Sequence, residues 1–276
     1  MRIDVSLPLS LFLILTLSLL LSGKIKRKVE AILGGKKLSV REIFFTVIFM
    51  GIMVSLIVLM PNYAIQILFI AAYSYMLLIF MYLLSNKMFL AFIPPAIFIV
   101  TYLMVYMLMG ESPTANVIMS VFASIFAIMI IAYLNSLFSW KIAILFAALL
   151  TAMDIIQVFI TAHMVEAANK MVTLRLPIAI FLPTFPSVGY AVLGLGDIFL
   201  SGILSIQAAN KYGWKTGFLV IASISVSLFI FEVIIFNLEL NLNGFPATII
   251  VLLGCLLGLS VHSLQIRIQQ KLQKNG

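Results

Sequence analysis

Three acidic residues, Asp154, Asp197 and Glu232, lie within long apolar stretches of the chain. An ionisable side chain is costly in such a setting and is therefore a candidate for function. Two carboxyl groups at close range cannot both ionise, so they share one proton and titrate as a pair. One of them can then act as a base toward water while the protonated one acts as an acid, and this chemistry hydrolyses peptide bonds.

Asp154 and Asp197 are the better candidates for such a pair. They belong to consecutive apolar stretches that run antiparallel, and both fall in the outer halves of their stretches. Around Asp197, small and polar residues recur at helical spacing, which predicts a face that other helices approach closely; they are Gly194, Asp197, Ser201, Ser205 and Ala208. Glu232 belongs to no motif, and we expect it to pack against a polar neighbour or to line a water-filled cleft.

The elements that must position these acids are membrane-spanning helices. The chain is 64% hydrophobic and only 9% charged, with a mean hydropathy of +1.23. The apolar runs lack the two-residue alternation of barrel strands, which leaves helices as the structure that satisfies the backbone in hydrocarbon. The sequence therefore predicts an all-α polytopic membrane protein with nine transmembrane helices, at about 7–21, 43–60, 63–84, 88–109, 117–134, 142–162, 189–208, 218–236 and 247–264.

These spans form one membrane-embedded domain over residues 1–276, with Asp154 in the part from about 7 to 162 and Asp197 in the part from about 189 to 264. Pro94 and Pro95 predict a kink in the fourth span. Between the sixth and seventh spans, polar residues mix with apolar ones before a proline-punctuated run. We expect a short amphipathic helix there, followed by an extended stretch from Thr173 to Phe185 at the outer membrane surface.

Basic residues indicate how the spans are oriented. Placing the N-terminus outside puts all of the 17 lysines and arginines in cytoplasmic segments except Arg2, Lys170 and Arg175. Cytoplasmic loops carry such an excess of positive charge. Lys24, Lys26, Arg27 and Lys28 closely follow the first apolar stretch, which favours a retained anchor over a cleaved leader. We therefore expect the C-terminus to be cytoplasmic.

The acids and their flanking residues resemble those of a known family, the presenilin and signal peptide peptidase group of intramembrane aspartyl proteases. Members of that family have nine membrane spans. One catalytic Asp lies in span six, another lies in a Gly-x-Gly-Asp motif in span seven, and a Pro-Ala-Leu motif opens span nine. Gly194-Leu195-Gly196-Asp197 is similar to the second motif. Asp154 occupies the place of the first and Pro246-Ala247-Thr248 that of the third. The orientation is similar to that of the signal peptide peptidase branch.

The resemblance extends over essentially the whole chain and implies a function. Asp154 and Asp197 would be catalytic, and the substrate would contact Gly194, Leu195, Gly196, Pro246, Ala247 and Thr248. Single-span membrane proteins or remnant signal peptides would be the substrates, cleaved within the lipid bilayer without a cofactor or metal. The stretch from Thr173 to Phe185 would pair with unwound substrate as an added strand. Two positions depart from the family, which usually has Tyr where Met153 stands and Leu where Thr248 stands.

Two other functions remain open at this stage. A prepilin-type peptidase also uses a Gly-x-Gly-Asp carboxylate, although proteins of that group have six spans rather than the nine predicted here. A proton-coupled secondary transporter could use membrane-embedded acids for ion coupling. A zinc protease is disfavoured because the residues after His163 do not complete a His-Glu-x-x-His motif. The basic residues flank apolar spans rather than forming a groove, so no nucleic-acid partner is expected.

Overall fold

The apolar stretches of the sequence fold as helices. The computed structural model describes residues 4–33, 35–110, 112–161, 163–184, 190–238 and 245–275. Its helices are α1 (Ser6–Leu33), α2 (Val40–Leu59), α3 (Asn62–Ser85), α4 (Met88–Ala91), α5 (Ile93–Leu108), α6 (Pro113–Leu134), α7 (Trp140–Ile155), the π-helix η1 (Ile156–Ile160), α8 (His163–Thr173), α9 (Leu195–Tyr212), α10 (Trp214–Leu238) and α11 (Thr248–Asn275). Two short strands, β1 (Ala179–Pro183) and β2 (Tyr190–Gly194), complete the described elements. The predicted all-α class is confirmed.

Eight stretches within the described residues are long and apolar enough to cross a membrane. They identify a multi-pass membrane protein, but they do not confirm the predicted count of nine. The helix that falls short is α9, the counterpart of the predicted seventh span. It carries Asp197, Gln207 and Lys211, and most of its residues are buried among other helices. An enclosed helix does not need the uniformly apolar surface that lipid demands, so composition alone does not mark it as a span.

Helix boundaries follow local signals in the sequence. Ser39 begins α2 through a capping box in which its side chain accepts from the Glu42 N–H while the Glu42 side chain accepts from the Ser39 N–H. Ser112 caps α6, whose first residue is Pro113. The predicted kink in the fourth span is confirmed as a break, because α4 ends at Ala91 and α5 starts immediately before the proline pair.

Three basic side chains bind the C-terminal carbonyl groups of other helices. Lys28 donates to Leu83 O at 2.6 Å and Leu84 O at 3.3 Å, at the end of α3. Lys170 donates to Ile57 O at 3.3 Å, Val58 O at 2.9 Å and also Met60 O, at the end of α2. Arg175 donates to Val105 O at 2.9 Å and Tyr106 O at 3.2 Å, at the end of α5. These cations satisfy carbonyl groups of the last helical turns, where intrahelical partners run out; Val105 O also accepts from the Met109 N–H.

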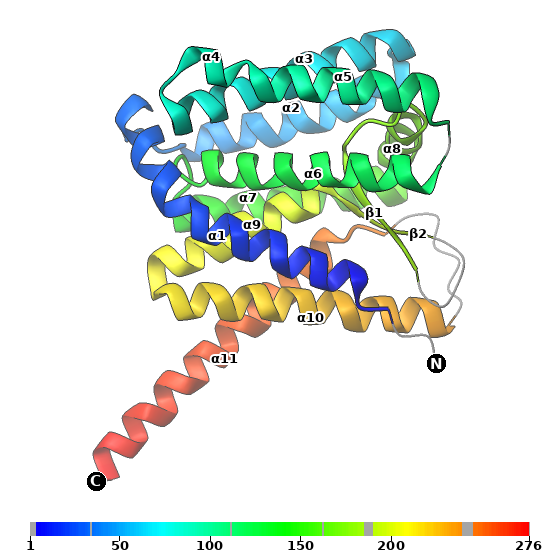
Figure 1. Ribbon diagram of the computed structural model, residues 1–276. Helices are drawn as coiled ribbons and strands as arrows, with labels where there is room; N and C mark the ends of the chain where they lie inside the picture. Colours follow the sequence, from blue (N-terminus) through cyan, green and yellow to red (C-terminus); the bar gives the residue numbers. More distant parts are fainter. Residues whose placement is uncertain are drawn as a thin grey trace.

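The helices pack in two groups around different cores (Figure 1). In one group α9 lies at the centre and contacts α1, α6, α7, α10 and α11. In the other, α3 and α5 pack together, and the ring of Tyr73 stacks on those of Phe98 and Phe126 at centroid distances of 4.3 and 4.2 Å. Figure 1 also shows the C-terminal part of α11 projecting beyond the bundle.

The region between α7 and α9 is only partly as the sequence predicts. The amphipathic helix is confirmed as α8, and the predicted extended stretch contains β1, although its last residue, Phe185, lies outside the described residues. Residues 190–194, which the sequence assigns to the seventh span, instead form β2 and pair antiparallel with β1. The predicted helical start near residue 189, itself outside the described residues, is therefore wrong, because α9 begins at Leu195. A short apolar run such as Tyr190-Ala191-Val192-Leu193 fits either a strand or a buried helix, so its pattern alone does not predict pairing with β1.

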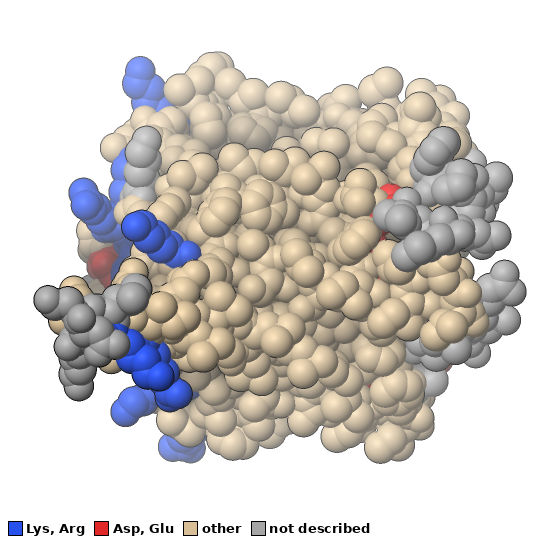
Figure 2. All heavy atoms as spheres, turned by 90° about the horizontal axis from the view of Figure 1, so that it is seen from below, with Lys and Arg blue, Asp and Glu red and all other residues tan. Residues whose placement is uncertain are grey.

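Basic side chains are unevenly distributed between the two ends of the bundle. In the face shown in Figure 2, the lysines and arginines lie together at one end, and a broad surface without charged side chains separates them from the other end. The N-terminus and the strands occupy the end opposite the C-terminus (Figure 1). The apolar middle includes large exposed side chains such as Phe45 and Phe49 on α2, as expected of a surface that faces lipid rather than water.

Candidate active site

Asp154 lies in the last turn of α7 and points toward the protein interior. Thr151 and Leu150 lie one turn before it on the same buried face, and the Asp154 side chain is itself buried. The helix changes to a π-helix directly after this turn, at Ile156. Single π-turns of this kind occur often at functional sites. The Gln157 side chain in the π-turn donates to Gly51 O at 2.9 Å, which fixes the end of the helix against α2.

Asp197 lies in the first turn of α9, which follows β2 directly. Its side chain is buried, and so are Ser201, Ser205 and Ala208 on the predicted small and polar face. Ser201 Oγ donates to Asp197 O at 2.7 Å, and Ser205 Oγ donates to Ser201 O at 2.7 Å. Because these hydroxyls are satisfied within α9, the face can pack closely against neighbouring helices without leaving polar atoms unpaired.

The fold brings the two predicted acids together. Helices α7 and α9 are in contact, and the Asp154 and Asp197 carboxyl groups lie close enough to interact electrostatically. Asp154 is in the last turn of α7, and Asp197 is in the first turn of α9, which follows the strand β2 directly. The third acid, Glu232, lies on a different helix, α10.

The predicted third motif also reaches Asp154. Pro246 and Ala247 lead into α11, and the hydroxyl of Thr248, at the first position of that helix, interacts with the Asp154 carboxyl. Thr248 is almost fully buried, and its Oγ1 has no hydrogen bond of good geometry among the described residues. The residue that departs from the usual Leu of the resembling family therefore places a hydroxyl beside one of the acids.

The other departure, Met153, packs against α2. A Cβ atom at Gly51 would lie 2.8 Å from Met153 Cε and 2.9 Å from its Sδ, so the absence of a side chain at Gly51 makes room for this methionine. No local pattern in the sequence indicates this contact. The position before Asp154 therefore contributes to packing between α7 and α2.

The two glycines of the motif leave space near Asp197. Gly194 has φ −67° and ψ 147°, a conformation open to any residue, and a Cβ atom there would lie 3.4 Å from Asp197 Oδ2. A Cβ atom at Gly196 would meet no atom within 4 Å. Leu195 between them donates its backbone N–H to Ile178 O at 3.0 Å, which ties the start of α9 to the segment before β1. The fold itself does not require glycine at either position.

One edge of the two-stranded sheet is covered, and the other has no backbone partner among the described residues. On β1, the Phe181 N–H donates to Ser120 Oγ at 2.8 Å, and Ser120 Oγ donates to Phe181 O at 3.2 Å. Phe181 therefore points its backbone groups away from β2. Its partner in the register is Val192, whose N–H and C=O must likewise point away from β1. Within the part of the chain that the structure describes, β2 therefore has an unpaired edge at Val192, shortly before the chain reaches Asp197.

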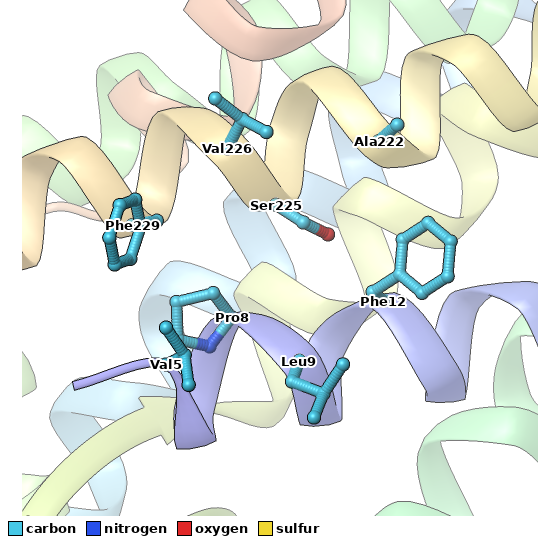
Figure 3. A pocket seen from close by; sticks show the side chains of 8 residues that line it. All are labelled: Val5, Pro8, Leu9, Phe12, Ala222, Ser225, Val226 and Phe229. Atoms are coloured by element: carbon cyan, nitrogen blue, oxygen red, sulfur yellow. The ribbon is translucent and has the colours of Figure 1, made fainter.

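A groove between α1 and α10 is not part of this site (Figure 3). It has a volume of about 290 Å³, and it is lined by apolar side chains and by Ser225, whose hydroxyl points from α10 into the gap. None of its lining residues belongs to α7 or α9. Within the part of the chain that the structure describes, no group of three or more His, Cys, Asp or Glu side chains is arranged to hold a metal ion.

Scans of the chain against protein-family models and against curated proteins gave no match.

Proposed function

We propose that this protein is an intramembrane aspartyl protease, similar in its motifs to the presenilin and signal peptide peptidase group. The observation that carries the proposal is the meeting of two buried carboxyl groups, Asp154 on α7 and Asp197 on α9. The hydroxyl of Thr248, in the place of the third motif, lies beside Asp154. A pair of acids from consecutive predicted spans, with a third segment beside them, supplies the groups that peptide hydrolysis needs.

The pair acts through one shared proton. The ionised carboxylate draws a proton from a water molecule as that water attacks the scissile carbonyl carbon. The protonated partner donates a hydrogen bond to the carbonyl oxygen and then delivers a proton to the leaving nitrogen. A second proton on the pair would remove the base, and loss of the shared proton would remove the acid.

The substrate has to unwind before it can react, because a helical peptide bond is closed to attack. The unwound segment then exposes backbone N–H and C=O groups that find no partners in hydrocarbon. The family resemblance assigns the pairing strand to the stretch from Thr173 to Phe185, which contains β1. Because Ser120 covers the outer edge of β1, we instead assign strand addition to the free edge of β2, at Val192.

We further propose nine membrane crossings, with α9 as the seventh, an outer N-terminus and a cytoplasmic C-terminus. In this arrangement Lys28 and the end of α3 that it binds are both cytoplasmic. Lys170 and Arg175 are both outside, as are the ends of α2 and α5 that they bind. These two are among the three basic residues assigned to the outside. Both bind helix carbonyl groups and so have a structural role. Their position outside is therefore weaker evidence against the rule that basic residues concentrate in cytoplasmic loops.

The activity is tested with detergent-purified protein and a tagged transmembrane peptide. We expect cleavage of the peptide, and its loss on adding a transition-state mimic directed at aspartyl proteases. Cleavage that persists in the presence of the mimic, or the absence of cleavage for a panel of such peptides, would contradict the proposal. Proton uptake coupled to solute movement in vesicles would instead support the transporter.

The orientation is tested by labelling cysteines in intact cells. In a Cys255→Ala background, Asn169→Cys reports on the outer end and Gln273→Cys on the C-terminal end, and both positions are exposed. An impermeant reagent should modify position 169 and spare position 273. The reverse pattern would show that the bundle is inserted the other way up.

A further inference from the structure

A cavity of about 330 Å³ lies between α10, β2, the start of α1 and the segment that leads into α11. Its wall is largely apolar and aromatic, with Phe231, Phe236 and Phe245 among the lining side chains. The rings of Phe231 and Phe245 pack against each other with a centroid distance of 4.6 Å. The acidic side chain in this wall is Glu232.

Glu232 is buried without a donor for one of its carboxyl oxygens. The residue is 8% exposed, and Oε2 makes no hydrogen bond with any described residue. The ion pairs found in the described part of the chain do not include it. Among the described residues, the charged group that interacts electrostatically with Glu232 is Asp4, a second acid. A buried carboxyl oxygen without a donor is costly, so this position favours a ligand that brings one.

The cavity adjoins the proposed active site through two segments. Ala247 lines the cavity, and the next residue, Thr248, interacts with Asp154. Val192 and Leu193 line it from β2, which leads directly into the turn that carries Asp197. A peptide strand lying along the free edge of β2 would therefore be able to place a side chain in the cavity while its backbone passes the acids.

We propose that this cavity is a subsite for a lysine or arginine side chain of the substrate close to the scissile bond. The aromatic wall packs against the aliphatic stem and the face of a ring attracts the cationic head, while Glu232 accepts its hydrogen bonds. This assignment rests on the proposed protease function and adds a substrate preference to it. It selects membrane segments with a basic residue near the cut over segments that are apolar throughout.

The test uses pairs of transmembrane peptides that differ at one position. Lysine is compared with methionine, which is also unbranched but apolar, at each of about five positions on either side of the cleavage site. We expect one position at which the wild-type protein prefers lysine by at least about tenfold in kcat/KM, the effect of one charge-assisted contact. Glu232→Gln should reduce this preference to about twofold or less, and Glu232→Lys should reverse it in favour of a glutamate peptide.

Two further variants separate recognition from folding. Phe245→Leu keeps the acid but removes a ring, and it should weaken the lysine preference without abolishing it. Glu166→Gln removes an exposed acid on α8, away from the cavity, and should leave the preference at its wild-type value. Equal cleavage of both peptides at every position by the wild-type protein, or an unchanged preference in Glu232→Gln, would overturn the subsite.

A binding measurement distinguishes failure of the subsite from failure of the protease proposal. In an Asp197→Asn background, fluorescence anisotropy of labelled peptides reports binding without turnover. Tighter binding of the lysine peptide that depends on Glu232 would support the subsite even if no peptide were cleaved. Equal binding of the two peptides would overturn the subsite, whether or not cleavage occurs.

Discussion

The glycines of the Gly-x-Gly-Asp motif offer a sharp test because the fold does not require them. We consider Gly196→Ala, with Gly202→Ala on the same helix as the matched control. A Cβ atom at Gly196 meets no atom within 4 Å, whereas one at Gly202 would lie 2.5 Å from Ile131 Cδ1 and 2.7 Å from its Cγ1. Both substitutions replace glycine by alanine within α9, so they share a favourable propensity change of at most about 1 kcal/mol.

We therefore expect Gly202→Ala to lower stability and Gly196→Ala to lower activity. Overpacking against Ile131 costs about 1 to 3 kcal/mol, so Gly202→Ala should be less stable than Gly196→Ala by that amount. In Gly196→Ala the fold should be as stable as the wild type or slightly more so. If substrate occupies the open space at Gly196, the same overpacking arises in the reacting complex and lowers kcat/KM by roughly 5- to 150-fold.

The assay measures unfolding in detergent and cleavage of one transmembrane peptide by both variants and the wild type. Wild-type kcat/KM in a folded Gly196→Ala protein would show that substrate does not use this space. A large loss of stability in the same variant would contradict the open surroundings of Gly196. A stability loss confined to Gly202→Ala, together with an activity loss in Gly196→Ala, would support a substrate path beside Asp197.

Three other predictions follow from the site. Asp154→Asn and Asp197→Asn should each lower kcat by about 10² to 10⁴-fold, with unfolding temperatures near that of the wild type; substantial turnover in either would contradict the paired mechanism. Cleavage should have a bell-shaped pH profile, because the pair works only with one shared proton, and a rate that climbs throughout the alkaline range would point to another base. Val192→Pro should reduce cleavage by removing an edge N–H, whereas Val192→Thr keeps that N–H and should retain most activity; equal rates in the two variants would argue against strand addition to β2.

The sequence predicts the features of this fold that arise from local composition. Apolar runs indicate the helices, the proline pair indicates the break before α5, and helical spacing indicates the buried face of α9. The strand β2 could not be predicted in this way, because its conformation depends on pairing with β1 across the chain. The π-turn after Asp154 has no sequence signal, and the cavity at Glu232 exists only once four segments meet.

Helices α2, α5 and α6 also help to position the site, although none of them carries an acid of the pair. The segment between α7 and β1 is anchored at three points. Its Lys170 binds the end of α2, its Arg175 binds the end of α5, and its Leu174 O accepts a hydrogen bond of 2.9 Å from the Tyr102 hydroxyl. Ser120 of α6 then fixes β1 at Phe181. These contacts position β1 before any substrate arrives, and β1 in turn positions β2. Under the proposed protease function, a preformed edge would lower the ordering cost of binding an unwound peptide, and these helices would contribute to activity without carrying either acid.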